Sequence, residues 1–245
     1  MLSRRSFLAL GAAGAGAAVA GGVVAGSFST AMREAEARLV GVSEVIPTRF
    51  GIMEYARAGE GPPLLMVHGS GGGFDQGLAF ARRLAAGHEV IAPSRFGYLR
   101  SDMPAAPASA EQAAAFVELL DHLDIDRLPV IGGSAGALSA IEFAIRHPDR
   151  CSALVAVVPA TYAPQRPSAQ PMGAMRETAM RAMLGSDFLF WSALHLMRGQ
   201  MVGTILATDP ALLAAAAPEE QARVEAILRG ILPVSRRSRG LLNDM

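Results

Sequence analysis

The sequence has one cysteine, few aromatic residues and no excess of charge of either sign. The single cysteine, Cys151, excludes an intramolecular disulfide, and no set of cysteine and histidine residues has the spacing of a zinc site. Cys151 begins an apolar run, which predicts a buried, inert thiol. Basic and acidic residues balance at 22 each, so no electrostatic argument favours a nucleic-acid partner. With 51% apolar residues, the 245-residue chain can form one large α/β domain.

The first 30 residues have the features of a targeting segment. Residues 3–8, S-R-R-S-F-L, closely resemble the bacterial twin-arginine export signal. An apolar Gly/Ala-rich run follows over Ala9–Ala25, and Ala25-Gly26-Ser27 suits signal-peptidase cleavage. An uncleaved anchor over Phe7–Phe28 is the alternative. We therefore expect an extracytoplasmic (periplasmic) protein, exported or tethered by residues 7–28, that meets the membrane only through this segment.

The next part of the chain, residues 31–160, alternates strand-like and helix-like segments. This order predicts an α/β fold with a doubly wound, mostly parallel sheet and helices on both faces. The predicted strands are Leu39–Arg49, Ile52–Ala58, Leu64–Val67, Glu89–Ala92, Leu128–Ile131 and Leu154–Val158. The predicted helices are Leu78–Ala86, Ala110–Leu123 with Ser109 as its cap, and Ala135–Ile145.

Residues 161–245 are rich in methionine and alanine and show no clear strand, so we expect a helical lid or cap region. Residues 236–239, R-R-S-R, form a short basic run. Such a run predicts a solvated helix face or end rather than a specific anion site. The candidate lid helices are Gln170–Leu184, Phe188–Ala207, Pro210–Ala217 and Glu219–Leu232.

The motif that carries chemistry is G-x-S-x-G, with Ser134 at its centre. An apolar strand-like run precedes it and a helix-like run follows, which is the strand-turn-helix setting that exposes a nucleophilic serine. Gly132 and Gly136 allow the tight turn to pack against neighbouring backbone, while the serine accepts an unfavourable backbone conformation. The alternative is a glycine-rich turn with an incidental serine.

A second glycine-rich loop, H-G-S-G-G-G at residues 68–73, follows an earlier apolar strand. Its amides, with the amide of Ala135 after the serine, predict an oxyanion hole. We expect the loop's donor to be Ser70, with Gly71 as its neighbour, and His68 and Gly69 to support the loop. A phosphate-binding loop is the alternative, but no Lys-Ser/Thr pair follows. We expect no metal and no organic cofactor.

These segments in this order, over roughly Glu44–Pro159, resemble the α/β-hydrolase superfamily. The resemblance implies a serine hydrolase acting on an ester, lactone, amide or C–C bond of a small molecule, with Ser134 as nucleophile. It also implies that Ser94–Asp102 is a structural run, through Arg95, Gly97, Ser101 and Asp102. Apolar side chains of the lid would then face the substrate, and the candidates are Met172, Met175, Met183, Phe188 and Trp191, although core packing is the expected role for most of them.

The acid and histidine that the superfamily places after the serine have no match in this sequence. His147 ends a helix and His195 lies on a predicted lid helix, so we expect structural roles for both. His68, His88 and His122 precede the serine, and we expect none of them to activate it. An incomplete sheet would leave an apolar edge beside Leu154–Val158.

Three hypotheses therefore stay open. The chain is the N-terminal part of a serine hydrolase that lacks the strands carrying the acid and the histidine. Alternatively, it is a non-catalytic binding or degenerate relative of the fold. The third hypothesis is an acyltransferase, because acyltransferases use the same serine elbow.

Overall fold

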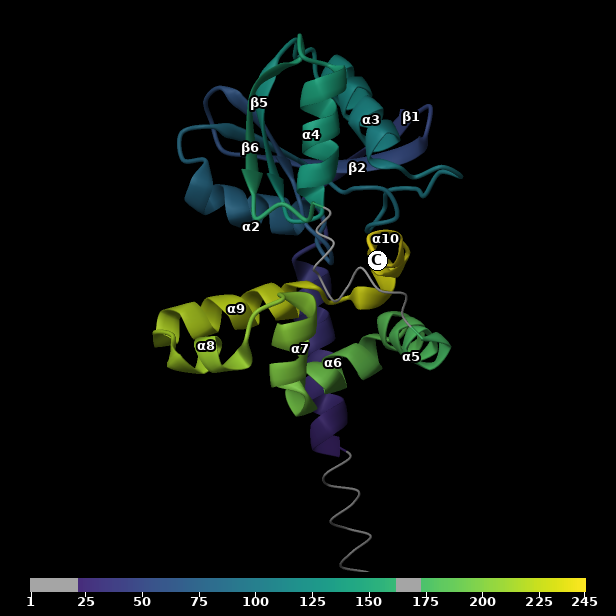
Figure 1. Ribbon diagram of the computed structural model, residues 1–245, viewed down its shortest axis with the longest axis vertical. Helices are drawn as coiled ribbons and strands as arrows, with labels where there is room; N and C mark the ends of the chain where they lie inside the picture. Colours follow the sequence, from purple (N-terminus) through teal and green to yellow (C-terminus); the bar gives the residue numbers. More distant parts are fainter. Residues whose placement is uncertain (1–21, 162–172) are drawn as a thin grey trace, which may run out of the picture.

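The structure is a computed structural model that describes residues 22–161 and 173–245, in a sheet-based core with a helical module beside it (Figure 1). Six strands form one sheet in the order β1-β2-β4-β3-β5-β6. The first two strands form an antiparallel hairpin, β2 pairs antiparallel with β4, and the remaining neighbours are parallel. The predicted mostly parallel sheet is thus confirmed. The strands are β1 Glu44–Thr48, β2 Gly51–Ala58, β3 Pro63–Val67, β4 Glu89–Pro93, β5 Leu128–Gly133 and β6 Cys151–Val157.

Helices cover both faces of this sheet, α2 (Phe74–Leu84) on one and α3 (Ser109–His122) with α4 (Gly136–Arg146) on the other. The alternation of side chains along β3 shows why. Leu65 and Val67 belong to the core beneath α3 and α4, whereas Leu64 and Met66 belong to the core beneath α2. A strand buried on both faces has to be apolar throughout, and β3 is.

Three predicted details of the core differ in the structure. The first predicted strand begins at Glu44 rather than Leu39, because Leu39 packs into the α2 core. Ser109 does not cap α3 but is its first residue, and no side chain caps this helix. Cys151 is half-buried rather than buried, its thiol donates to the Ala153 carbonyl, and burial raises the pKa of the thiol.

The C-terminal part of the described chain is helical, as predicted, with one predicted helix divided. Phe188–Ala207 forms α6 (Asp187–Leu196) and α7 (Arg198–Ile205), because Met197 leaves helical backbone at φ −130°. The turn lets Trp191 of α6 and Met201 of α7 share one core. The remaining helices are α5 Ala174–Leu184, α8 Pro210–Ala215, α9 Pro218–Gly230, the 3₁₀ turn η2 Val234–Arg236 and α10 Ser238–Asn243. Positions 170–172 of the predicted lid, Met172 among them, lie outside the described residues.

Residues 22–37 form a helix that packs into the same helical module (Figure 1). Ala35 is 1% exposed. The Phe28 ring lies edge-on to Phe188 and Trp191, with ring centroids 5.3 and 5.7 Å away. Residues 22–30 of the predicted targeting segment therefore contact the lid, while residues 1–21 lie outside the described part. Within the described residues, no helix combines the length and apolarity that a membrane span requires.

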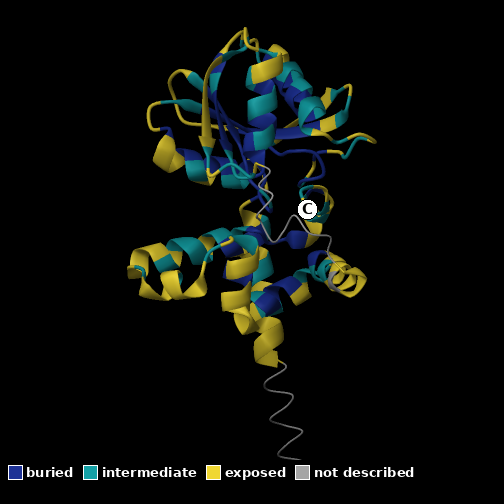
Figure 2. Ribbon diagram, in the orientation of Figure 1, coloured by how far each residue is buried: buried dark blue, intermediate teal, exposed yellow. Residues whose placement is uncertain are grey.

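The sheet ends at β6, whose residues are largely exposed (Figure 2). Leu154 and Val155 keep 38% and 48% of their surface in solvent, and Val158 keeps 78%. In the described chain β6 pairs only with β5. This edge is apolar, and its outer backbone groups have no neighbouring strand.

The packing of the helix at residues 22–37 predicts that a charged substitution destabilises the lid at a buried position of this helix but not at an exposed one. Ala35→Asp should lower the free energy of unfolding by about 3 kcal/mol, because it buries an unpaired carboxylate. Ala37→Asp, on the exposed side of the same helix, should change it by less than about 0.5 kcal/mol. Trp191, the single tryptophan, reports the lid core, so its fluorescence in a denaturant titration measures both variants. Equal effects of the two substitutions would contradict the packing.

Candidate active site

Ser134 lies on a strained turn between β5 and α4. Its φ is +49°, in the left-handed region that costs a non-glycine residue about 1–3 kcal/mol. Hydrogen bonds hold the turn: the Ser134 amide donates to the Val157 carbonyl at 3.0 Å, and its carbonyl accepts from Ala137 and Ala160 at 3.1 Å each. The hydroxyl has no hydrogen-bond partner in the described part of the chain.

The turn packs directly against the loop at residues 68–73. A Cβ on Gly136 would lie 2.2 Å from the His68 carbonyl oxygen, so only glycine fits there without moving backbone. A Cβ on Gly132 would lie 2.7 Å from the Ala137 Cα. A Cβ on Gly69 would lie 3.1 Å from the Ser134 Cβ, so the serine side chain is next to this loop. The structure thus brings together two motifs that lie about sixty positions apart in the sequence.

Two of the three predicted oxyanion donors are available. The amides of Ser70 and Ala135 donate to no other group of the described residues. The Gly71 amide is occupied, because it donates to the Tyr98 hydroxyl at 3.3 Å. The Gly69 amide donates to Gln76 Oε1 at 2.9 Å, which holds the start of the loop. Two unoccupied amides are the number of donors that an oxyanion hole requires, and their role as such stays a prediction.

His68 is fully used in holding the loop. Its Nε2 accepts from the Arg95 amide at 2.9 Å, so its Nδ1 carries the proton and donates to the Gly69 carbonyl at 2.7 Å. Burial, together with the positive charge of Arg95, holds the pKa of His68 well below 6.5. The ring is neutral and both nitrogens are engaged, so His68 cannot accept the proton of Ser134.

The histidines that follow the serine also lie elsewhere. His147 ends α4 against the Phe143 ring, and burial lowers its pKa. His195 Nδ1 lies 2.8 Å from the Trp191 carbonyl oxygen in α6. In the described ranges no histidine or carboxylate contacts Ser134 Oγ, and no cluster of three or more His, Cys, Asp or Glu side chains could hold a metal ion.

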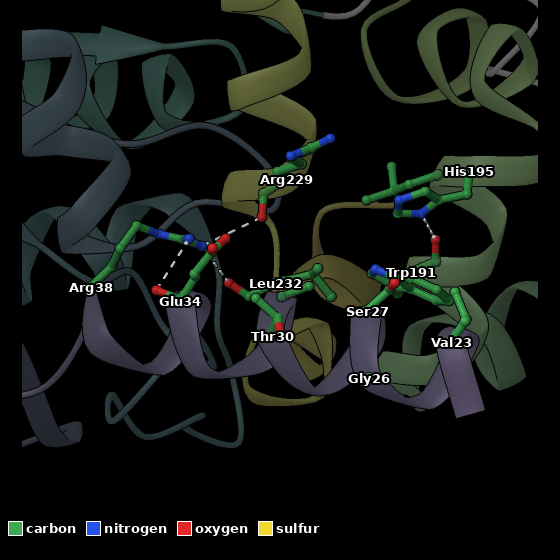
Figure 3. A pocket seen from close by; sticks show the side chains of 12 residues that line it. Val23, Gly26, Ser27, Thr30, Glu34, Arg38, Trp191, His195, Arg229 and Leu232 are labelled. Atoms are coloured by element: carbon green, nitrogen blue, oxygen red, sulfur yellow. Dashed lines mark hydrogen bonds between the residues drawn. The ribbon is translucent and has the colours of Figure 1, made fainter. Parts of the chain in front are cut away.

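A cavity of about 560 Å³ lies within the lid, between helix 22–37, α6 and α9 (Figure 3). Trp191 and His195 lie on one side of it, and Glu34 and Arg38 on the other. Arg38 Nη2 donates to the carbonyl of Leu232 at 3.0 Å. Trp191 therefore lines a lid cavity, and neither this cavity nor its lining includes Ser134.

Four of the five apolar lid candidates lie in the described residues, and they differ in exposure. Met183 on α5 is half-buried against the lid core. Met175 on α5 is 86% exposed, Phe188 is 45% exposed, and Trp191 is buried against Phe28. Their described contacts are with the lid core and solvent, so a substrate-facing role for them stays a prediction.

The segment at residues 234–244, here called the C-terminal arm, packs under the loop at residues 68–73. Arg237 of this arm is 0% exposed, pairs with Asp75 at 2.8 Å and donates to the Gly72 carbonyl. The prediction of a solvated run at Arg236–Arg239 is therefore wrong for Arg237. Sequence pattern could not reveal this, because the partners lie 162 and 165 residues away.

Asp244, at the end of the arm, joins three groups around the loop. Its carboxylate accepts from Arg95 Nη1 at 2.9 Å, from the Tyr98 hydroxyl at 2.6 Å and from Ser70 Oγ at 2.8 Å. Burial lowers the pKa of Arg95, but the Asp244 carboxylate and Tyr98 together raise it above the ordinary value of an arginine. Burial also raises the pKa of Tyr98. Asp244 and Tyr98 were not predicted, because no local motif marks them.

Residues 62–196 match the family model described as alpha/beta hydrolase fold, so the chain belongs to the α/β-hydrolase family. It is 30% identical to a solved alpha/beta hydrolase fold protein from Nakamurella multipartita, with a TM-score of 0.56, over 83% of this chain and 73% of that one.

Two curated relatives match a shorter segment. The uncharacterized hydrolase YcgS of Bacillus subtilis is 35% identical over 45% of this chain and 39% of its own length. The 2-hydroxy-6-oxononadienedioate/2-hydroxy-6-oxononatrienedioate hydrolase of Paraburkholderia xenovorans is 36% identical over 46% of this chain and 42% of its own. The chain thus spans about two fifths of the length of these relatives.

The buried arm predicts unequal roles for two neighbouring arginines. Arg237→Met should cost about 3 kcal/mol of unfolding free energy, because the Asp75 carboxylate, 12% exposed, loses its partner. Arg239→Met should cost less than about 0.5 kcal/mol, since Arg239 is exposed and forms no ion pair with the described residues. Urea denaturation measures both, and a tolerated Arg237→Met would argue against the arm's role.

His68 predicts a pH dependence of stability. In the folded chain the pKa of His68 lies well below 6.5. As the pH falls below 6.5, the unfolded chain therefore takes up a proton at this histidine, whereas the folded chain does not. This group should leave stability level above pH 6.5 and reduce it by up to about 1.4 kcal/mol per pH unit below. His68→Gln should flatten the slope between pH 7.5 and 5, and His122→Gln, at an exposed position, should not. If the wild-type protein, His68→Gln and His122→Gln all show the same slope of unfolding free energy against pH, His68 is not the group responsible.

Proposed function

We propose that this chain carries out serine hydrolase chemistry at Ser134 on a small-molecule ester, lactone, amide or C–C substrate. The observation that carries the proposal is the free Ser134 hydroxyl on its strained turn, next to the unoccupied amides of Ser70 and Ala135. In the proposed step, Ser134 Oγ bonds to the substrate's carbonyl carbon, and the two amides stabilise the oxyanion. The oxyanion then collapses, and the leaving group departs with the proton that Ser134 has lost. Water then cleaves the acyl–serine bond, which returns the serine hydroxyl and releases a carboxylic acid.

The proton of Ser134 needs a base, and the described residues place none beside it. Loss of the base histidine costs serine hydrolases about a millionfold in turnover. We therefore propose slow acylation of Ser134 for this chain, and full turnover where a base reaches the serine. The names of the relatives support hydrolysis in general, and the Paraburkholderia relative's name adds support for the C–C class.

We also propose that residues 1–30 direct the protein out of the cytoplasm or tether it to the inner membrane. The support is the Ser3–Leu8 motif with its paired arginines. Phe28, which contacts Phe188 and Trp191, follows the expected cleavage site at Ala25-Gly26-Ser27, so this contact is kept whether or not the segment is cleaved there.

The proposed chemistry predicts covalent labelling of one serine. A fluorophosphonate probe should label the 245-residue protein slowly at Ser134, and Ser134→Ala should abolish the labelling. Ser139→Ala is the matched control, since Ser139 lies in α4 with its hydroxyl bonded to the Gly136 carbonyl. Free imidazole should speed the reaction by supplying the missing proton acceptor. If the folded protein stays unlabelled with and without imidazole, the non-catalytic binding hypothesis is favoured instead.

A further inference from the structure

Ser70, whose amide is the proposed donor of the loop at residues 68–73, lies in a turn that the backbone alone does not fix. The Gly72 amide donates to the Gly69 carbonyl at 3.2 Å, and Gly71 has a φ of +74°, as in a type II turn. Glycine adopts the negative φ of a type I turn equally well, so the peptide between Ser70 and Gly71 could flip. Side chains from outside the loop must therefore hold this peptide in its present orientation.

Two contacts hold Ser70 and its following peptide, and both lead to Asp244 at the end of the C-terminal arm. The Ser70 hydroxyl donates to Asp244 Oδ2 at 2.8 Å. The Gly71 amide donates to the Tyr98 hydroxyl at 3.3 Å, and that hydroxyl donates to the same Oδ2 at 2.6 Å. Burial raises the pKa of Tyr98, so the phenol keeps the proton that it donates. One oxygen of Asp244 thus fixes the Ser70 side chain directly and the next peptide through Tyr98.

The Asp244 carboxylate is itself held firmly. Arg95 donates to both of its oxygens, at 2.9 and 2.5 Å, and the two side chains are 9% and 6% exposed. Arg95 is fixed in turn by His68, because its amide donates to His68 Nε2 and its Nε donates to the His68 carbonyl. The backbone of the arm adds a bond from the Gly240 amide to the Gly97 carbonyl at 3.0 Å. A buried, charged acceptor with a fixed partner is a rigid support for the neutral donors that it binds.

Loss of the carboxylate would release both contacts at once. Serine hydroxyls in turns bond readily to nearby backbone groups, and a flipped peptide would turn the Gly71 amide away from Tyr98. Either change would move the Ser70 amide, and a misplacement of about 1 Å can cost roughly a hundredfold in rate.

We propose that Asp244 is a positioning residue of the oxyanion hole. Its carboxylate holds the Ser70 hydroxyl and, through Tyr98, the Gly71 amide, so the Ser70 amide is the one that stays unoccupied and aimed at the oxyanion. The consequence for rate rests on the proposed function, whereas the geometry of the loop does not depend on any reaction at Ser134.

Amide hydrogen exchange, followed by NMR of ¹⁵N-labelled protein, tests the positioning without any reaction. In Asp244→Ala the Gly71 amide should exchange at least about tenfold faster relative to the amides of β3. Asp244→Asn keeps an oxygen that accepts from Ser70 and Tyr98, so its Gly71 amide should exchange within about threefold of the wild-type rate. Asn243→Ala is the matched control and should leave the exchange unchanged, since Asn243 donates to the Pro107 carbonyl at 3.3 Å.

The two substitutions of Asp244 separate its hydrogen bonds from its ion pair. Both remove the charge that pairs with Arg95, so a purely structural role of the ion pair would be lost equally in the two variants. Equal exchange of Gly71 in both variants, or unchanged exchange in folded Asp244→Ala, would overturn the proposal. Tyr98→Phe keeps the ion pair and serves if Asp244→Ala does not fold. It should speed exchange of the Gly71 amide at least about tenfold, and an unchanged rate would contradict the proposal.

Fluorophosphonate labelling connects the positioning to the proposed chemistry. Asp244→Ala should label Ser134 at least about tenfold more slowly than the wild-type protein, whereas Asp244→Asn and Asn243→Ala should stay within about threefold of it. A wild-type protein that never labels rejects the chemistry, while the exchange pattern still supports the positioning. Equal labelling of folded Asp244→Ala and the wild-type protein keeps the chemistry and overturns the role of Asp244.

Discussion

The site depends on the close contact between the elbow at Ser134 and the loop that begins at His68. Gly136 meets the His68 carbonyl at a distance that excludes any side chain, and Gly69 packs tightly against Ser134, since an added Cβ would lie 3.1 Å from the serine Cβ. Both contacts hold the loop against the elbow. The strained φ of Ser134 persists because its amide donates to the Val157 carbonyl and its carbonyl accepts from the amides of Ala137 and Ala160.

The C-terminal arm stabilises this contact from outside. Arg237 reaches the loop through Asp75 and the Gly72 carbonyl, and Asp244 reaches it through Arg95, Tyr98 and the Ser70 hydroxyl. Anchoring Ser70 by its hydroxyl leaves its amide free for an oxyanion. The ion pairs are buried, so each charge is neutralised by its partner side chain and not by water. The lid and the oxyanion loop are therefore mechanically connected through the arm.

The proposed chemistry follows from backbone amides that the fold leaves unpaired. The amides of Ser70 and Ala135 donate to no other group of the described residues. The buried ring of His68, by contrast, has both of its nitrogens paired. Unpaired backbone amides on the two segments that meet at a serine are the arrangement expected of a site that receives a carbonyl oxygen from a substrate.

Local pattern was sufficient for much of this protein. The spacing of the apolar residues indicated the sheet and its helices, and the glycines around Ser134 indicated the elbow. Both signals arise from the steric demands of residues that are neighbours in the sequence. No local sequence pattern indicated the roles of Arg237, Asp244 and Tyr98. Their partners lie up to 174 residues away, so only the tertiary structure could decide which charges are buried and which amides stay free.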